Sequence, residues 1–543
     1  MTSERADLVI RNARVWSEGA LRPGADAVAV RDGRVRALGP SHGLDAWIGE
    51  GTRVVDARGT TLTPGLTDAH IHLLEWARAL DQIPLRDARS SDEVARRVER
   101  FAAARPGDEA LIGRGWDENE WPVPPRRDAL DRAAPRRPVL LHSHDFHALW
   151  VNGEALRRAG ITRATPDPAG GRIERDSNGE PTGVLREHAV RLVAELLASE
   201  DDEADLERLG RASARLLAWG VTGVHSFEGP RAHRLARRLT GGAGSRVRVL
   251  MHLAHAGLDA AGELGLASGL GDDWFRVGAI KLFADGTLGS RTAAVFEPYA
   301  GSTDRGMELI GPAELRELVG RAASAGLAIA IHAIGDRAVA HALDAIEAAG
   351  ERIRRPPLPP RIEHVQLIRE ADVARFAALG VIASLQPSHA VADRELVARA
   401  WPDRTDRAYP ARSLLSAGAR LALGADAPVE PPDPSLGLHA AVTRRAPGDP
   451  GVPWLAAQTL TLDQALTGYT EGPARAAGQW PRLGRIAIGS PADLVVWDAD
   501  LHALQRDALA LARPRLTVLE GQVVHEATEP APKPAGRAIQ VAS

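Results

Sequence analysis

The stretch TPGLTDAHIH at residues 63–72 decides the fold, because it places two histidines at the end of a short apolar strand. Side chains alternate between the two faces of a strand, so His70 and His72 point the same way and suit one metal ion. A His-x-His pair is weak evidence by itself, since the chain holds 18 histidines and His142 and His144 form a second pair. The position of the first pair, shortly after a Pro-Gly turn, favours it over the second.

Apolar runs like this one recur along the chain and alternate with helical stretches. Such alternation predicts βα units joined into a parallel sheet. The candidate strands cover residues 66–72, 221–227, 247–254, 276–286, 327–335, 361–367, 381–387 and 420–428. Eight strands are what a (β/α)8 barrel requires, so the sequence predicts an α/β fold built on a TIM barrel.

The two ends of the chain share a residue pattern that differs from that of the middle. Short segments such as DLVIRNARVW near the start and ADLVVWDAD near the end alternate apolar and polar residues, which is typical of short β-strands. We predict that residues 1–62 and 475–526 pair into a small β-sandwich, with the barrel at residues 63–474 inserted between them. Residues from about 80 to 215 are too many for one crossover and are predicted to form an inserted lobe, whereas residues 527–543 read as a loose tail.

Metal-compatible side chains stand in further predicted strands, near the carboxyl ends where TIM-barrel active sites lie. The fourth strand offers Lys281, the fifth His332, the sixth His364 and the eighth Asp426. Each of them alone is more simply explained as a hydrogen-bonded core residue. Together with the histidine pair of the first strand they follow the barrel order, which a packing role explains poorly. We therefore predict that these side chains converge on a metal centre at one rim of the barrel.

Lysine usage singles out one position. The chain has 67 lysines and arginines, of which only Lys281 and Lys533 are lysines, and Lys533 lies in the predicted tail. A lysine buried among apolar neighbours can lose its proton, and a neutral amine can add carbon dioxide to give an anionic carbamate. Arginine cannot do this. Chance explains a lone lysine equally well, but a carbamate able to bridge two metals gives it a chemical reason.

Composition excludes several classes of site and partner. The chain has no cysteine, which rules out disulfides, thiolate ligands and cysteine nucleophiles. A net charge of −4 gives no electrostatic case for nucleic acid or a membrane surface as partner. The N-terminus lacks the apolar region of a signal peptide, and no apolar stretch is long enough to span a bilayer. The simplest expectation is a cytoplasmic enzyme.

The motifs around these residues resemble the amidohydrolase superfamily, in particular amidohydrolase family three and its N-substituted formamide deformylase-like branch. The resemblance covers nearly the whole chain and is carried by PGLTDAHIH, KLFADGTLGSRTA, IHAIGDRAV, RIEHVQ, SLQPSH, GADAPVEPPDP and SPADLVVWDAD. The motifs are weak singly and specific in combination.

The resemblance implies a set of metal ligands. His70, His72 and Asp426 are expected to bind the more buried ion. Lys281, as a carboxylated lysine, is expected to bridge to a second ion held by His332 and His364. Zinc is the metal expected first, with iron, manganese and nickel left open, as is a form with a single ion.

Further roles follow from the same motifs. A metal-activated water would attack the substrate, with Asp426 as general base that passes the proton to the leaving amine. The resemblance makes the stretches around Trp116, Asp117 and His147 candidate pocket walls, and Arg291 could steady a substrate carbonyl or carboxylate. Gln386 and His389 are similar candidates. For each of these substrate residues, packing or a surface contact is an equally good explanation.

The expected activity is hydrolysis of a non-peptide C–N bond in a small-molecule amide, such as an N-substituted formamide. A cyclic amidase of the hydantoinase or dihydroorotase kind is the alternative on the same barrel. From a different class, a non-catalytic ligand-binding relative would keep the barrel but lack ligands, whereas all six predicted positions are filled. The sequence leaves the exact substrate and the oligomeric state open, a homodimer included.

Overall fold

The protein is described by a computed structural model that divides into two compact units. The barrel unit comprises Met1–Trp76 with Leu206–Gln540, and the inserted unit comprises Ala77–Asp205 with the last three residues. The structure describes residues 5–116, 118, 121–143, 148–168, 171–193, 196, 201–242, 244 and 246–527. No helix within those ranges is long and apolar enough to cross a membrane.

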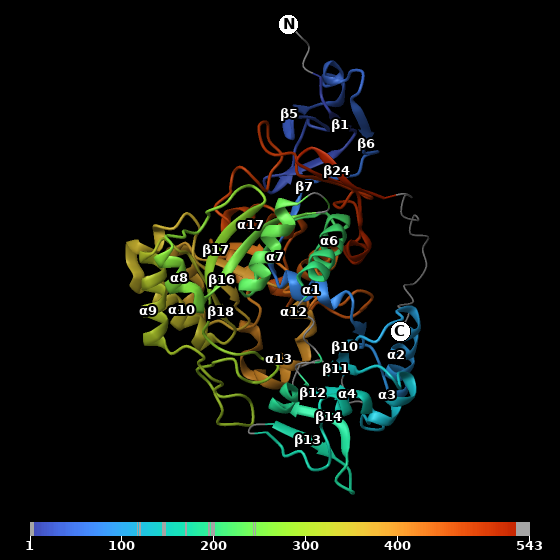
Figure 1. Cartoon of the computed structure of the whole chain (residues 1–543). Coiled ribbons are helices and arrows are strands. Elements are labelled where there is room, and N and C mark those ends of the chain that lie inside the picture. The colour runs from blue at the N-terminus through green and yellow to red at the C-terminus, as the bar shows by residue number, and fades with distance from the viewer. Residues whose placement is uncertain are drawn as a thin grey trace. The chain divides into compact units, whose positions relative to one another are not determined.

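An eight-stranded parallel sheet forms the centre of the barrel unit and confirms the predicted TIM barrel (Figure 1). Each neighbouring pair is parallel, from β8 through β15, β16 and onward to β21. The strands are β8 (Leu66–Ile71), β15 (Val221–Phe227), β16 (Arg248–Ala254), β17 (Phe275–Phe283), β18 (Ile329–Ala333), β19 (Arg361–His364), β20 (Ile382–Leu385) and β21 (Arg420–Leu423). All eight overlap the candidates expected from the sequence.

The barrel closes where the chain that follows β21 runs beside β8. The backbone N–H of Asp426 donates to His70 O at 2.7 Å, and that of His72 donates to Ala427 O at 2.8 Å. The carboxylate of Asp68 accepts N–H groups from both sides, from His70 at 3.0 Å and from Ala425 at 3.2 Å. These contacts fix the first and last strands side by side, so residues from the two ends of the barrel sequence meet at this seam.

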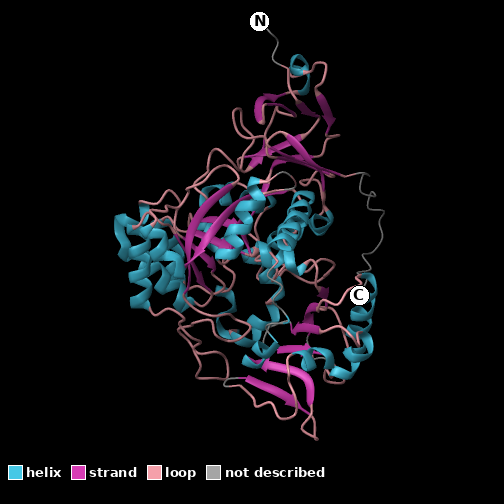
Figure 2. Cartoon of the chain, in the orientation of Figure 1, coloured by secondary structure: helices cyan, strands magenta, loops and turns pink. Residues whose placement is uncertain are grey.

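Helices cover the outside of the barrel, as Figure 2 shows. Ile280 and Leu282 of β17 belong to the same buried cluster as residues of the outer helices, such as Leu315 and Leu343. Lys281, between them in sequence, points to the barrel interior, because side chains alternate along a strand. The helices of the barrel unit are α1 (Leu73–Ala79), which runs into the inserted unit, α6 (Asp202–Ala218), which begins there, α7 (Pro230–Gly241), α8 (Leu258–Glu263), α9 (Pro312–Ser324), α10 (Asp336–Ala349), α11 (Glu370–Leu379), α12 (Pro387–Ala392), α13 (Arg394–Ala400), α14 (Ala411–Ser416), α15 (Pro434–Thr443), α16 (Leu462–Tyr469) and α17 (Glu471–Ala476).

The two ends of the chain pair into a β-sandwich, as predicted. One sheet has the order β5-β4-β1-β6, and the other has the order β24-β23-β22-β7-β2-β3. The second sheet joins both ends of the sequence, since β7 pairs antiparallel with β22. The strands are β1 (Leu8–Arg11), β2 (Arg14–Ser17), β3 (Ala20–Leu21), β4 (Ala27–Arg31), β5 (Arg34–Gly39), β6 (Arg53–Asp56), β7 (Thr61–Pro64), β22 (Leu494–Trp497), β23 (Pro514–Leu519) and β24 (Gln522–Glu526).

A buried ion pair ties the sandwich to the barrel. Arg248, at the start of β16, donates to both carboxylate oxygens of Asp493 at 2.8 and 3.1 Å. We expect Asp493→Ala to lower the free energy of unfolding by about 3 kcal/mol, because it leaves a buried cation without its main partner. Glu520 Oε1, 3.3 Å from Arg248 Nη2, limits the loss.

Chemical unfolding of the full chain checks this expectation. Glu526→Ala is the control, because its ion pair with Arg53 is exposed and is worth at most about 1 kcal/mol. Equal unfolding midpoints for the two variants would show that the buried pair does not stabilise the barrel unit.

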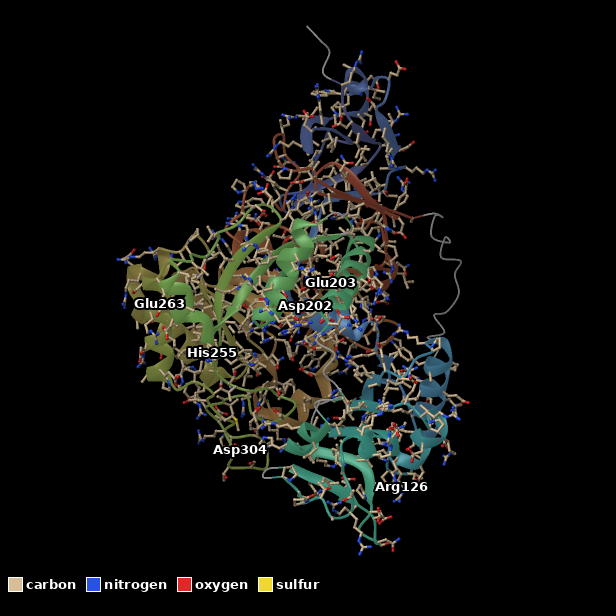
Figure 3. All side chains as sticks on the ribbon, in the orientation of Figure 1. Arg126, Asp202, Glu203, His255, Glu263 and Asp304 are labelled. Atoms are coloured by element: carbon tan, nitrogen blue, oxygen red, sulfur yellow. The ribbon has the colours of Figure 1, made fainter. Side chains whose placement is uncertain are left out.

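The inserted unit has its own mixed sheet, of order β13-β14-β12-β11-β10-β9. It spans 77–205, whereas the lobe was expected at about 80–215, and most of α6 belongs to the barrel unit because this helix leads into β15. Acidic Asp202 and Glu203 open α6 (Figure 3), where negative charge suits the helix dipole. The elements of the inserted unit are β9 (Ile83–Pro84), α2 (Ser91–Ala104), β10 (Leu111–Trp116), α3 (Arg127–Ala133), β11 (Val139–Ser143), β12 (Ala148–Val151), α4 (Gly153–Arg158), β13 (Gly171–Arg175) and β14 (Pro181–Glu187). The predicted tail at 527–543, apart from Ala527, lies outside the described residues.

Candidate metal centre

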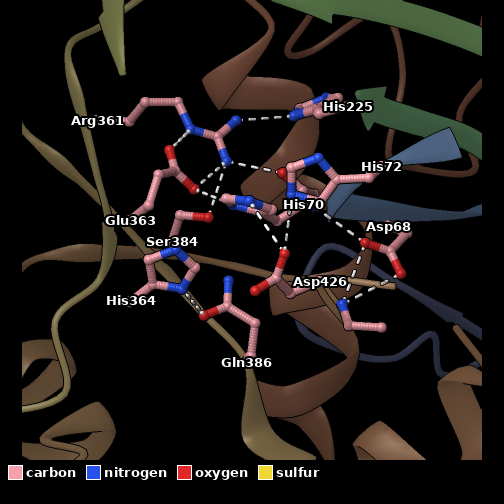
Figure 4. A network of polar contacts seen from close by, with 12 residues as sticks. Asp68, His70, His72, His225, Arg361, Glu363, His364, Ser384, Gln386 and Asp426 are labelled. Atoms are coloured by element: carbon pink, nitrogen blue, oxygen red, sulfur yellow. Dashed lines mark hydrogen bonds and ion pairs between the residues drawn. The ribbon is translucent and has the colours of Figure 1, made fainter. Parts of the chain in front are cut away.

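Side chains from β8, β19 and the segment after β21 meet at the carboxyl end of the barrel (Figure 4). Asp426 Oδ1 lies 3.4 Å from His70 Nε2 and 3.3 Å from His72 Nε2. His70, His364 and Asp426 each offer one ligand atom, and these atoms lie within 4.8 Å of one another. The structure therefore brings together four of the six predicted metal-binding side chains, three imidazoles and the carboxylate of Asp426.

His332 and Lys281 extend this cluster. The ring of His332 lies 4.6 Å from that of His364, measured between centroids. The amine of Lys281 lies 4.4 Å from the ring centroid of Phe227, which itself stacks on His70 at 4.1 Å. The positive charge of Lys281 contributes to lowering the pKa values of the His70 and His332 imidazoles, so the amine lies within electrostatic reach of both.

The hydrogen bonds of His70 test whether the site fits a metal. Its Nδ1 lies 2.7 Å from Glu363 Oε2. Because the carboxylate of Glu363, paired with Arg361, can only accept, Nδ1 carries the proton and Nε2 is left as an acceptor. Nε2 and Asp426 Oδ1 are then two acceptors 3.4 Å apart, an arrangement that a shared cation would stabilise. The donor set therefore fits a divalent metal bound by imidazole and carboxylate.

Burial keeps several imidazoles in the neutral form that binds metals. It lowers the pKa of His70 to about 4 and that of His332 to about 3, with the charge of Lys281 adding to the effect. His72 behaves differently: although burial opposes it, the hydrogen bond to Asp426 raises the pKa of His72 above its usual value. The negative charge of Asp426 thus favours the protonated form of His72.

Asp426 and Lys281 are shifted toward the forms that suit such a site. Burial alone would raise the pKa of Asp426, but the His70 imidazole and the hydrogen bond from His72 hold it well below its usual value. Burial lowers the pKa of the Lys281 amine to about 8. Lys281 makes no hydrogen bond or ion pair with any residue that the structure describes, and its side chain is 5% exposed. Its amine is therefore closer to neutrality than that of an ordinary lysine.

Unusual backbone angles aim two of the ligands. His364 has φ of 76° and Asp426 has φ of 59°, in the left-handed region that residues other than glycine seldom occupy. In a regular strand His364 would point away from the face on which Glu363 lies. The turn at His364 brings its ring to within 4.9 Å of the His70 ring. Backbone strain of this kind concentrates at functional sites.

Three buried charged residues that the sequence analysis did not single out, Asp285, Arg361 and Glu363, lie next to the predicted ligands or to one another. Arg361 and Glu363 form an ion pair inside the barrel, and both are buried (Figure 4). Asp285, also buried, accepts backbone N–H groups from Ala294, Ile334 and Gly335 at 2.8 to 3.0 Å. Asp285 thereby fixes the loop ends around His332. The signal that could have found them is a charged residue inside an otherwise apolar barrel strand or directly after one.

The predicted substrate residues are spread over both units. Trp116 ends β10 in the inserted unit, where it is buried and its indole N–H donates to Leu141 O at 2.7 Å. This is a packing role, so a role as pocket wall stays a prediction. Asp117 and His147 lie outside the described residues. Arg291 is exposed, with φ of 56°, and no side-chain hydrogen bond or ion pair links it to another described residue.

Two side chains after β20 contact the cluster directly. Gln386 Oε1 accepts a hydrogen bond from Nδ1 of His364 at 2.9 Å. His389, in α12, places its Nε2 3.9 Å from Asp426 Oδ2, and this buried nitrogen has no hydrogen-bond partner among the described residues.

Comparison with known proteins agrees with this geometry. Residues 53–525 match the model of the amidohydrolase family. The chain is 33% identical to the putative amidohydrolase YtcJ of Bacillus subtilis, over 92% of this chain and 96% of that protein. It is 31% identical to the N-substituted formamide deformylase of Arthrobacter pascens, over 92% of this chain and 94% of that protein.

A solved structure supports the same relationship. An uncharacterized metal-dependent hydrolase from Pyrococcus furiosus superposes with a TM-score of 0.73 and is 28% identical, and the match covers 90% of this chain and 98% of that one. With the fold, the cluster at the barrel mouth and a family match over most of the sequence in agreement, this chain belongs to the amidohydrolase family.

Proposed function

We propose that the chain is a metal-dependent hydrolase that cleaves a non-peptide C–N bond in a small amide, with an N-substituted formamide as the leading substrate. The observation that carries the proposal is the pair of acceptors, His70 Nε2 and Asp426 Oδ1, that face each other in a buried site. The similarity to an N-substituted formamide deformylase supports the substrate class.

The proposed ligands fall into two groups. His70, His72 and Asp426 would hold the more buried ion, and His332 with His364 would hold a second one. Lys281, as a carbamate, would bridge the two; the lowered pKa of its amine supports this role, because only a neutral amine adds carbon dioxide. Imidazole and carboxylate ligands suit zinc. When bound, a divalent metal supplies Lewis acidity, which polarises the substrate carbonyl and makes water acidic enough to attack at neutral pH.

The residues of the chain then handle the proton. Asp426, ionised because its pKa is held low, accepts a proton from the attacking water. It returns that proton to the amide nitrogen as the C–N bond breaks, so that the products are a carboxylic acid and an amine. For a formamide these are formic acid and the N-substituted amine. His389, whose Nε2 lies 3.9 Å from Asp426 Oδ2 without a hydrogen-bond partner among the described residues, is a further group proposed to contact the substrate.

Removal of metal tests the proposal. Dialysis against a chelator is expected to abolish hydrolysis of an N-substituted formamide, and added zinc is expected to restore at least half of it. Elemental analysis before and after dialysis measures metal per chain, and an amine-detecting assay measures turnover. Small cyclic amides in the same assay test the cyclic amidase alternative.

The control is the chelator-treated protein incubated with Mg²⁺, which prefers oxygen ligands and is expected to restore little activity. Full turnover by a chain shown to hold no metal would contradict the proposal. Tight metal binding with no hydrolysis of any amide would instead favour the non-catalytic relative.

A further inference from the structure

We infer that the two metals are held with unequal affinity, and that Glu363 is the positioning residue that makes the ion bound by His70 and His72 the tighter one. The inference rests on the proposed function, because it concerns the same ligands. It follows from the hydrogen-bond partner of each ligating imidazole, on the side of the ring away from the metal. Partners of this kind fix the orientation of a ligating histidine and raise its basicity.

A carboxylate stands behind His70. Glu363 is fully buried, and its Oε2 accepts the Nδ1–H of His70 at 2.7 Å. Its other oxygen, Oε1, accepts from Arg361 Nε at 2.5 Å. An arginine remains protonated under all ordinary conditions, so the carboxylate beside it stays anionic. His70 is thereby kept in one tautomer, with Nε2 free to bind a cation.

The Arg361 guanidinium is itself held by three further barrel strands. It donates to Ala69 O in β8 at 2.7 Å, to Ser384 Oγ in β20 at 2.8 Å and to His225 Nδ1 in β15 at 2.9 Å. Since all of these groups are buried, neither Arg361 nor Glu363 can turn away from its partners without leaving a charge unpaired. His70 therefore has a rigid and anionic support.

Neutral groups stand behind His364 and His332. His364 Nδ1 pairs with the amide oxygen of Gln386 at 2.9 Å, while the buried amide nitrogen of that glutamine has no hydrogen-bond partner among the described residues. His332 Nε2 pairs with the backbone carbonyl of Gly286 at 3.0 Å. A carboxylate oxygen of Asp285 lies 3.6 Å from the same nitrogen, too far for a hydrogen bond. Both oxygens of Asp285 already accept backbone N–H groups.

The difference in charge predicts a difference in affinity. Loss of a group behind a ligating histidine weakens metal binding by about 10- to 100-fold. An anionic, doubly anchored carboxylate supports its imidazole more strongly than a neutral amide does. The ion at His70, His72 and Asp426 is therefore the one retained at low metal concentration, and the ion at His332 and His364 exchanges.

Competition with a chelating dye tests this order on the full-length protein. Apo protein titrated with Zn²⁺ is expected to show two classes of site, one equivalent each, separated by at least about 10-fold. Glu363→Gln is expected to weaken the tight class by about 10- to 100-fold and to leave the weak class within threefold of wild type. Gln386→Ala, the matched variant, is expected to weaken only the weak class.

Folding of each variant is checked by far-UV circular dichroism, since Glu363→Gln leaves Arg361 less well paired. If that variant does not fold, Gln386→Glu decides in its place: a carboxylate behind His364 is expected to narrow the gap between the classes by about 10-fold. Two zinc equivalents bound with one affinity would overturn the inference and leave the proposed function intact. Loss of the tight class in Gln386→Ala would also overturn it. Failure to bind zinc at all would instead remove the proposed function.

Discussion

Asp426→Asn is expected to leave the chain folded while kcat for an N-substituted formamide falls by roughly 10²- to 10⁴-fold, the usual contribution of a general base. The amide has nearly the same shape as the carboxylate but cannot accept the proton of the attacking water. It also removes the negative charge that faces His70 Nε2 and His72 Nε2 at 3.4 and 3.3 Å. Steady-state kinetics, with metal content measured on the same sample, separates the loss of the base from the loss of metal.

Asp433→Asn is the matched control for this variant. Asp433 is also buried and lies in the same segment, but its carboxylate caps helix α15 by accepting Ser435 N–H at 3.0 Å. Asparagine caps helices as well as aspartate does, so kcat is expected to stay within about twofold of wild type. A normal kcat in metal-replete Asp426→Asn would end the assignment of Asp426 as the base.

Lys281→Arg is expected to reduce bound metal from two ions to one at most and to abolish measurable hydrolysis. Arginine keeps the positive charge but cannot become a neutral amine, so it cannot form a carbamate. Its permanent charge would also lie near His70 and His332, whose pKa values are lowered by the charge of the lysine. Elemental analysis gives metal per chain, and carbon-13 NMR of protein incubated with labelled bicarbonate reports the carbamate directly.

The sequence offers an unusually clean control for this experiment, because Lys533 is the only other lysine. Lys533→Arg is expected to keep wild-type metal content, turnover and a single carbamate signal. A Lys281→Arg protein that binds two metals and hydrolyses amides would remove the carbamate from the proposal. It would leave the remaining five ligands to be tested separately.

The barrel could be predicted because its strands are short, apolar and separated by amphipathic helices. His70 and His72 follow the two-residue period of β8, so the sequence alone predicts that both side chains point the same way. The ends of the chain could likewise be assigned to one β-sandwich, because both have the alternation of half-buried strands. The antiparallel pairing of β7 with β22 confirms that assignment.

Other parts of the site could not be read in this way. The direction of His364 depends on a φ of 76°, and a period-two pattern would have sent its ring to the opposite face from Glu363. Arg361 and Glu363 stand out in the sequence only as charges in a short strand, and their ion pair and their contact with His70 appear only in the folded barrel. For Trp116 the motif suggests a pocket wall. In the structure its indole N–H donates to Leu141 O within the inserted unit, which is a packing role.

Closure of the barrel between β21 and β8 makes the proposed metal centre depend on synthesis of the last barrel strand. His70 leaves the ribosome early, whereas Asp426, whose backbone N–H bonds to His70 O, follows only after all eight barrel strands have been made. A nascent chain that ends before Asp426 has the imidazoles but lacks the carboxylate that faces His70 Nε2 and His72 Nε2. Such a chain cannot complete the proposed ligand set, so a product that ends before residue 426 is expected to be inactive.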